Sequence, residues 1–128
     1  MKKIISIFIS IVTLLCMFPF TISSSALEYK NFDYEVVSSY VVITGYNGTS
    51  TEVTIPAKID GKSVKKIKDS AFKDNKKLTD VVIGSGIEDI GASAFENCTK
   101  LETISLPDTV IHIGKKAIYN TAYYNDKS

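Results

Sequence analysis

A chain of 128 residues is short enough to predict a single domain, and its 15 lysines and 14 acidic residues leave a formal net charge of only +1. This balance argues against nucleic-acid binding, which requires a basic face. All the basic residues are lysines, so bidentate recognition of phosphate or carboxylate by guanidinium groups is also excluded.

Residues 1–26 have the pattern of a secretory signal peptide. Lys2 and Lys3 precede an apolar run from Ile4 to Phe20, and the small residues Ser24 and Ala26 occupy the −3 and −1 positions of a cleavage site. Cleavage would remove both lysines and change the formal charge from +1 to −1. We therefore expect a secreted or cell-surface protein that makes no membrane contact after cleavage.

Two alternatives for this segment stay open. An apolar run of roughly 17 residues or more is also long enough to span a bilayer as an uncleaved anchor. Cys16 would be the modified residue of a lipoprotein signal, although such a signal has a small residue before the cysteine and Leu15 is large.

Residues 27–63 are expected to form an N-terminal β-hairpin cap and a zeroth strand of the repeat array. Apolar residues alternate from Phe32 to Val36, and strand patterns follow over 40–43 and 52–55. Asn47-Gly48, between the last two, predicts a hairpin turn. The hairpin would cover the open core of the first repeat, which a solenoid requires.

Residues 64–124 repeat with a period of about 23. Two full repeats, 64–86 and 87–109, precede a partial third, 110–124, and a tail, 125–128. The register rests on apolar pairs one period apart: Val64 and Ile87, Ile67 and Ile90, Phe72 and Phe95, Leu78 and Leu101, Val81 and Ile104, Ile83 and Leu106. Units this short bury their apolar faces only by stacking on neighbours, which predicts a solenoid.

Each repeat is expected to contain a strand and a helical segment, so the predicted fold class is an α+β solenoid. Val81 and Ile83 are two residues apart and therefore share the inward face of a strand. From Val64 to Phe72 the apolar residues are three and four apart, which predicts one or two helical turns on the opposite, convex side.

The pattern from Ile87 to Pro107, I-x-x-I-G-x-x-A-F-x-x-C-x-x-L-x-x-I-x-L-P, resembles the BspA-type leucine-rich repeats of secreted and surface bacterial proteins. The resemblance covers roughly residues 34–124. It implies a short leucine-rich repeat fold and, from longer members, adhesion to host or partner-cell proteins. Two full repeats, a partial third and no attached domain are expected here, and in these respects the chain would differ from the longer members.

The strand residues that point away from the core are the candidate binding face. Three strands about 4.8 Å apart give a face about 10–15 Å wide, which is small against the roughly 800 Å² per partner of a stable interface. The partner would be a protein or glycan at the cell surface, and the alternative is a solvated face without a ligand. The candidates on the concave side form two rows: Glu52, Asp80 and Thr103, and Thr54, Val82 and Ser105.

No catalytic, metal or cofactor site is predicted. His112 is the only histidine and lies between Ile111 and Ile113, so a structural role is expected, and one histidine and one cysteine do not make a zinc site. Cys98 aligns with Asn75 at a turn and is expected to be a buried structural thiol, with a reactive or intermolecular thiol as the alternative.

Two surface features have more than one interpretation. At the C-terminus, Tyr119, Tyr123 and Tyr124 either cap the solenoid or leave an open end that another chain covers, which would allow self-association. The lysines of the first repeat are expected on a helical face that is either solvated or in contact with an anionic cell-wall polymer: Lys65, Lys66, Lys68, Lys73, Lys76 and Lys77.

The sequence therefore predicts a secreted or cell-surface leucine-rich repeat protein that acts as a non-enzymatic interaction module. One alternative is a truncated fragment of a larger surface protein without its own activity. Another is an enzyme or effector on a repeat scaffold, which is disfavoured because any nucleophile–base pair would need the lone His112.

Overall fold

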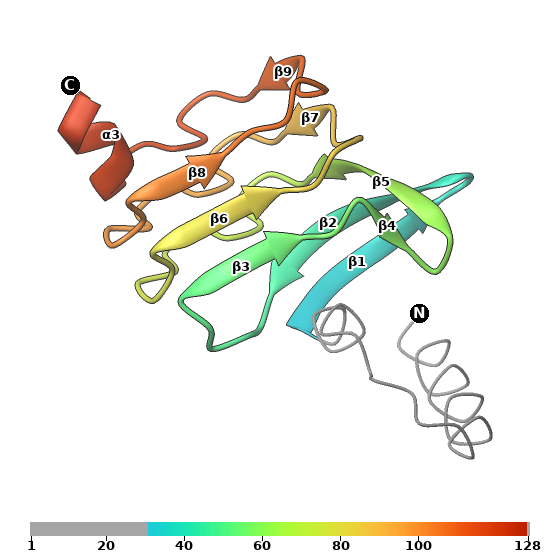
Figure 1. Ribbon diagram of the computed structural model, residues 1–128, viewed down its shortest axis with the longest axis horizontal. Coiled ribbons are helices and arrows are strands. Elements are labelled where there is room, and N and C mark those ends of the chain that lie inside the picture. Colours follow the sequence, from blue (N-terminus) through green and yellow to red (C-terminus); the bar gives the residue numbers. More distant parts are fainter. Residues whose placement is uncertain (1–30, 128) are drawn as a thin grey trace.

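The computed structural model describes residues 31–127, which form a short stack of coils built mostly from strands and turns (Figure 1). The predicted signal peptide, 1–26, and residues 27–30 of the predicted cap lie outside the described residues. Within the described residues, no helix is long and apolar enough to cross a membrane.

Two sheets form the walls of the stack. Sheet A has the strand order β1-β2-β5-β7-β9, with β4 paired to β5, and sheet B has the order β3-β6-β8. Figure 1 shows the strands of each sheet in successive levels, with α3 at the C-terminal end of the stack. The elements are β1 (Phe32–Val37), β2 (Tyr40–Tyr46), β3 (Glu52–Ile55), β4 (Lys58–Ile59), β5 (Lys62–Ile67), β6 (Asp80–Ile83), β7 (Asp89–Ile90), β8 (Thr103–Ser105), β9 (His112–Ile113) and α3 (Ala122–Lys127).

The strand register follows the repeat period. Asp89 of β7 lies opposite Lys66 of β5 and His112 of β9, each 23 residues away, and these strands run parallel. The solenoid with a period of about 23 residues is thus confirmed. The zeroth strand β3 also pairs with β6 in the predicted register, with Val53 opposite Val81.

The helical turns predicted in the first part of each repeat are wrong. Strands β5 and β7 occupy these segments, and turns follow them. Ser70 and Asp74 in the first of these turns both have a φ of 62°, and left-handed residues interrupt a right-handed helix. The chain is mostly strand, so the α+β label is not confirmed. The left-handed conformation recurs one and two periods later at Ser93, Asn97, Lys116 and Asn120.

The N-terminal hairpin joins different strands from those predicted. β1 and β2 pair antiparallel, with Phe32 opposite Tyr46, and their turn is at Ser38-Ser39. Asn47-Gly48, the predicted turn, instead begins the connection from β2 in sheet A to β3 in sheet B. The two strands predicted to form the hairpin therefore belong to different walls of the stack.

Contacts with the start of β1 explain why Asn47 does not form the hairpin turn. Its backbone N–H donates to the Asn31 carbonyl at 2.7 Å, and its side-chain amide donates to Asp33 Oδ2 at 2.6 Å. These bonds extend the pairing of β1 with β2 beyond Tyr46, so the chain turns only afterwards. The capping role of this hairpin stays a prediction.

The core lies between the two sheets and is filled by equivalent residues of successive coils. An aromatic row runs through it: the ring centroids of Tyr46 and Phe72 are 5.7 Å apart, and those of Phe72 and Phe95 are 4.9 Å apart. Phe32 of β1 packs against Tyr46 at 5.2 Å. Buried aliphatic residues line both walls: Val41, Ile43, Val64, Ile67, Ile87 and Ile90, and Val53, Ile55, Val81 and Ile83.

Neighbouring coils approach so closely that the residues directly after β7 and β9 need to be glycine. A Cβ on Gly91 would lie 2.4 Å from the backbone nitrogen of Asp69, and a Cβ on Gly114 would lie 2.4 Å from that of Ala92. Because the obstructing atoms are backbone, a methyl group there would force the two coils apart. The two glycines are one period apart and serve the same contact at successive levels.

We expect Phe95→Ala to lower the free energy of unfolding by about 3–5 kcal/mol, since removing this fully buried ring, which stacks on Phe72, would leave a cavity. Denaturant unfolding followed by circular dichroism measures the change. The control Val82→Ala, at a position 44% exposed, should change it by no more than about 0.5 kcal/mol. A loss below about 1 kcal/mol for Phe95→Ala would contradict the proposed core.

Candidate interaction surface

The outer face of sheet B carries all six predicted binding residues. Strand pairing aligns them in the two predicted rows, while Val53 and Val81 between the rows point into the core. Asp80 is half-buried and the other five are exposed. Their placement follows the prediction, and their role in binding stays a prediction. The rows are Glu52, Asp80 and Thr103, and Thr54, Val82 and Ser105.

This face is polar with one apolar residue at its centre. Val82, 44% exposed, lies between Thr54 and Ser105 in the middle strand. The Thr79 hydroxyl donates to Asp80 Oδ2 at 2.7 Å, which fixes the carboxylate at one end of the strand. Beyond β8, an open hollow of about 340 Å³ is lined by Glu102, Ala122 and Asp126.

The lysines of the first repeat lie on β5 and the turns that follow it, not on a helical face. Three of them form ion pairs with carboxylates one period later: Lys65 with Glu88, Lys66 with Asp89 at 2.9 Å, and Lys73 with Glu96 at 2.9 Å. Lys68 pairs with Glu35 at 3.4 Å, and Lys76 Nζ donates to the Asn97 carbonyl at 2.9 Å. Much of the basic charge of this surface is therefore balanced by neighbouring coils.

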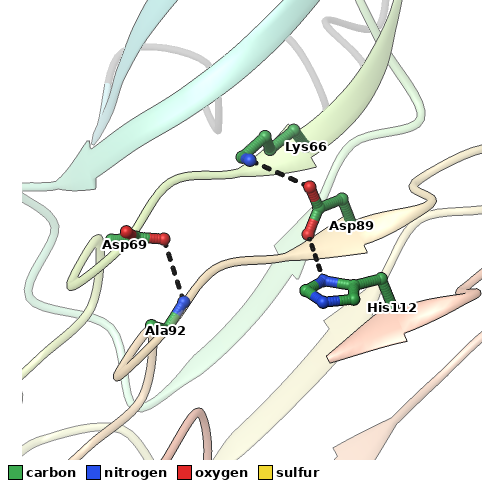
Figure 2. Close-up of polar contacts among 5 residues, drawn as sticks. All are labelled: Lys66, Asp69, Asp89, Ala92 and His112. Atoms are coloured by element: carbon green, nitrogen blue, oxygen red, sulfur yellow. Dashed lines mark hydrogen bonds and ion pairs between the residues drawn. The ribbon is translucent and has the colours of Figure 1, made fainter. Parts of the chain in front are cut away.

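Asp89 links three coils through its two carboxylate oxygens (Figure 2). Oδ2 accepts a hydrogen bond from Lys66 Nζ at 2.9 Å, and Oδ1 lies 3.0 Å from His112 Nδ1. The bond from Lys66 lowers the pKa of Asp89, with a smaller contribution from His112, and the same bond raises the pKa of Lys66. Nearby, Asp69 Oδ1 accepts from the Ala92 N–H at 2.9 Å.

His112 is an exposed residue of the edge strand β9. Its side chain is 67% exposed, and within residues 31–127 its ring hydrogen-bonds only to Asp89. A histidine–carboxylate pair needs a nucleophile to form a hydrolytic site, and none is hydrogen-bonded to this ring in the described part of the chain. The described residues also contain no group of three side chains suited to hold a metal ion.

Cys98 lies in the core, as expected for a structural thiol. It is fully buried, and its thiol donates to the Phe72 carbonyl of the preceding coil at 3.1 Å. Burial raises the pKa of Cys98 to about 11, which keeps the thiol protonated at neutral pH. The aligned Asn75 satisfies backbone groups instead, because its Oδ1 accepts from the N–H groups of Lys77 and Leu78.

The sequence analysis missed a side-chain ladder along the turns. Asn97 Nδ2 donates to Asp74 Oδ1, and Asn120 Nδ2 donates to Asn97 Oδ1, both at 2.9 Å. The sequence pattern that could have predicted this ladder is a carboxylate or amide side chain every 23 residues, at positions 74, 97 and 120. The ion pairs between coils left a similar signal, since lysines at 65, 66 and 73 align with acidic residues at 88, 89 and 96.

The sequence of the chain matches the model of one known protein family. The model for the BspA type leucine rich repeat region (6 copies) matches residues 45–126, more than half of the sequence. The chain therefore belongs to the BspA-type leucine-rich repeat family, as its repeat pattern predicted. No curated protein matches the sequence significantly.

Solved bacterial structures share this fold. A leucine-rich repeat protein of T. pallidum is 34% identical with a TM-score of 0.69, over 71% of this chain and 44% of that chain. A leucine-rich cell surface protein of Faecalibacterium prausnitzii A2-165 is 31% identical with a TM-score of 0.65, over 70% and 26%. One from Bacteroides ovatus ATCC 8483 is 29% identical with a TM-score of 0.63, over 80% and 27%. The match spans less than half the length of each of these proteins.

We expect Asp89→Asn to lower the free energy of unfolding by about 1 kcal/mol at pH 7, because it removes the charge that bridges three coils. The folded state lowers the pKa of Asp89, so the stabilisation is complete above the unfolded pKa of about 3.9 and is lost as the pH falls through the folded value. Urea unfolding of both proteins at several pH values should therefore give curves that converge in acid. The exposed Asp108→Asn is the control, and equal effects of the two substitutions at pH 7 would contradict the role of Asp89.

We expect the Cys98 thiol to react slowly with a disulfide reagent at pH 8 in the folded protein, because the thiol is buried and its pKa is about 11. In urea the same thiol should react at least about a hundredfold faster, since an exposed thiol has a pKa near 8.5. Absorbance of the released chromophore follows both rates. Equal rates in the two states would mean that Cys98 is accessible.

Proposed function

We propose that this protein is a non-enzymatic interaction module that works outside the cell or at its surface and binds a protein or glycan through the outer face of sheet B. The supporting observation is a contrast between the two sheets. Lys65 and Lys66 of β5 are ion-paired with the next coil. Glu52 and Asp80 on sheet B have no lysine partner among the described residues. Carboxylates without an internal cation are free to pair with a ligand.

The make-up of the outer face of sheet B also favours recognition. Hydroxyl groups of Thr54, Thr103 and Ser105 can both donate and accept hydrogen bonds. Val82 at the centre offers apolar area, and interfaces commonly combine an apolar centre with a polar rim. A glycan or an extended peptide lying across the three strands would meet both rows of side chains.

The width of this face favours weak or multivalent binding. Three strands about 4.8 Å apart offer less than the roughly 800 Å² per partner that a standard interface buries. Several weak contacts become strong when binding sites are linked. A role in adhesion, where many copies act at once on one surface, fits this limit.

The comparisons support the class of function. BspA-type leucine-rich repeat proteins are generally interaction modules, and one structural relative is described as a cell surface protein. The predicted signal peptide supports the same location. The His112–Asp89 pair, with no nucleophile bonded to it among the described residues, gives no reason to prefer an enzyme.

We expect Val82→Arg to weaken binding at least tenfold, because a long charged side chain at the centre of this face would block close contact. The protein is first screened on an array of surface proteins and glycans, and each binder is then titrated by biolayer interferometry. Ser85→Arg adds the same charge at an exposed turn of the same coil and should leave the affinity unchanged. Equal affinity of Val82→Arg and the unmodified protein for every binder would overturn the proposed face.

A further inference from the structure

The C-terminal end of the stack exposes side chains whose equivalents in earlier coils are buried. Ile113 is 49% exposed, whereas its equivalents Ile90 and Ile67 are 2% and 0% exposed. Leu106 is 47% exposed, whereas its equivalent Ile83 is 3% exposed. Core positions are therefore partly uncovered at this end of the stack. From here on we use the word tail for this end, with Leu106, Ile111 and Ile113, and not for residues 125–128 alone.

The tail also carries an apolar residue where other coils are charged. Ile111 is 82% exposed and aligns with Lys65 and Glu88, which form an ion pair. It precedes β9, the edge strand of sheet A, whose outer side pairs with no other strand in residues 31–127. An exposed edge with large aliphatic side chains is a template for strand addition.

The opposite end of sheet A, which we call the head, is the edge strand β1. Val36 and Val37 are 36% and 39% exposed, and the Glu35 side chain is 46% exposed. The outer side of β1, like that of β9, has no strand partner among the described residues. A hollow of about 50 Å³ lined by Phe32, Tyr46 and Val53, among others, opens beside β3 at the same end.

The two ends of the stack carry opposite net charge. The net charge of successive segments alternates in sign along the stack. Residues 32–63 contain four carboxylates and two lysines, and residues 64–86 contain six lysines and three carboxylates. Residues 87–109 contain five carboxylates and one lysine, and residues 110–127 contain three lysines and one carboxylate. The tail is thus basic, through Lys115 and Lys116, and the head is acidic, through Asp33 and Glu35. Within the chain, opposite signs on adjacent coils form the ion pairs already described.

We propose that the tail of one copy of this chain binds the head of a second copy, so that β9 of the first pairs with β1 of the second and sheet A continues across the junction. A two-fold arrangement of tails would instead bring Lys115 and Lys116 of both copies together, and like charges across an interface are unfavourable. Glu35 already pairs with Lys68 at 3.4 Å, and both side chains stay about half exposed, so Glu35 can also attract the lysines of the other copy. A head-to-tail contact gives a ring only if the rotation between copies closes, and continuation of sheet A along the axis of the stack gives an open series of oligomers instead.

The first test measures mass against concentration by sedimentation velocity on residues 27–128, because the buried core of the described chain lies within residues 32–121. The expected result is a weight-average mass that rises continuously through dimer and trimer. Ile111→Lys should weaken association at least tenfold, whereas Val82→Lys, at a similarly apolar exposed site on sheet B, should leave it unchanged. A monomer at all concentrations, a closed dimer, or equal association of Ile111→Lys and the unmodified protein would each overturn the proposal.

Engineered cysteines test which ends meet. The only natural thiol in residues 27–128 is the buried Cys98, so new surface cysteines report on their own positions. A mixture of the Val36→Cys and Ile111→Cys proteins under mild oxidation should give mixed disulfides at least tenfold faster than either protein forms a disulfide with itself. Faster linkage of Ile111→Cys with itself would indicate a two-fold tail contact and overturn the head-to-tail arrangement.

A charge exchange separates the interface from folding. Lys115→Glu with Lys116→Glu should weaken association at least tenfold at low salt, and mixing this variant with Glu35→Lys should restore it. Circular dichroism and thermal unfolding confirm that each variant is folded. If the mixture associates no better than either variant alone, complementary charge does not hold the ends together and the proposal fails.

Discussion

The rest of this structure depends on hydrogen bonds between corresponding turns of stacked coils. In the turns that join the two sheets, the N–H groups of Phe72 and Phe95 donate to the carbonyls of Ala94 and Ala117 at 2.8 and 2.7 Å. Buried backbone groups need partners, and here the adjacent coil supplies them. A repeat of any other length would separate these N–H groups from the carbonyl groups of the adjacent coil. The extra residues between β3 and β6 are accommodated by β4, which pairs with β5 beside the stack.

Stacking equivalent residues has an electrostatic consequence. Side chains at one position of neighbouring strands are only about 5 Å apart, so a charge repeated unchanged would repel itself along the stack. On sheet A the chain avoids this by placing opposite charges at equivalent positions, as in Lys65 with Glu88 and Lys66 with Asp89. On sheet B, by contrast, Glu52 lies opposite Asp80. The turns use amides as well, since an amide can both donate and accept, and Asn97 does so between Asp74 and Asn120. Charge pattern and repeat length therefore specify the order of coils together.

The sequence predicted what depends on periodicity and missed what depends on turns. The register of β6 and β8 was predictable, because the alternation in each strand and the 23-residue period leave one alignment. β3 lies outside this period, and its own alternation placed Val53 and Ile55 on the inward face. The helical turns were wrong because apolar spacings of three and four also fit a short strand followed by a tight turn, and non-glycine residues such as Ser70 give little warning of a left-handed conformation. The Asn47-Gly48 turn failed because its local preference competes with strand pairing to β1. The ion pairs between coils could be predicted only after the register of the strands was known.

The two proposed surfaces make different demands on the same fold. The outer face of sheet B is limited by the number of strands, and residues 31–127 supply three. Joining head to tail would place the rows of one copy beside those of the next if sheet B continued as sheet A does, so the face would grow without any change in sequence. Linked sites gain affinity through effective concentration rather than new contacts. A short solenoid that assembles through its ends would thereby acquire the extended surface that its own length does not provide.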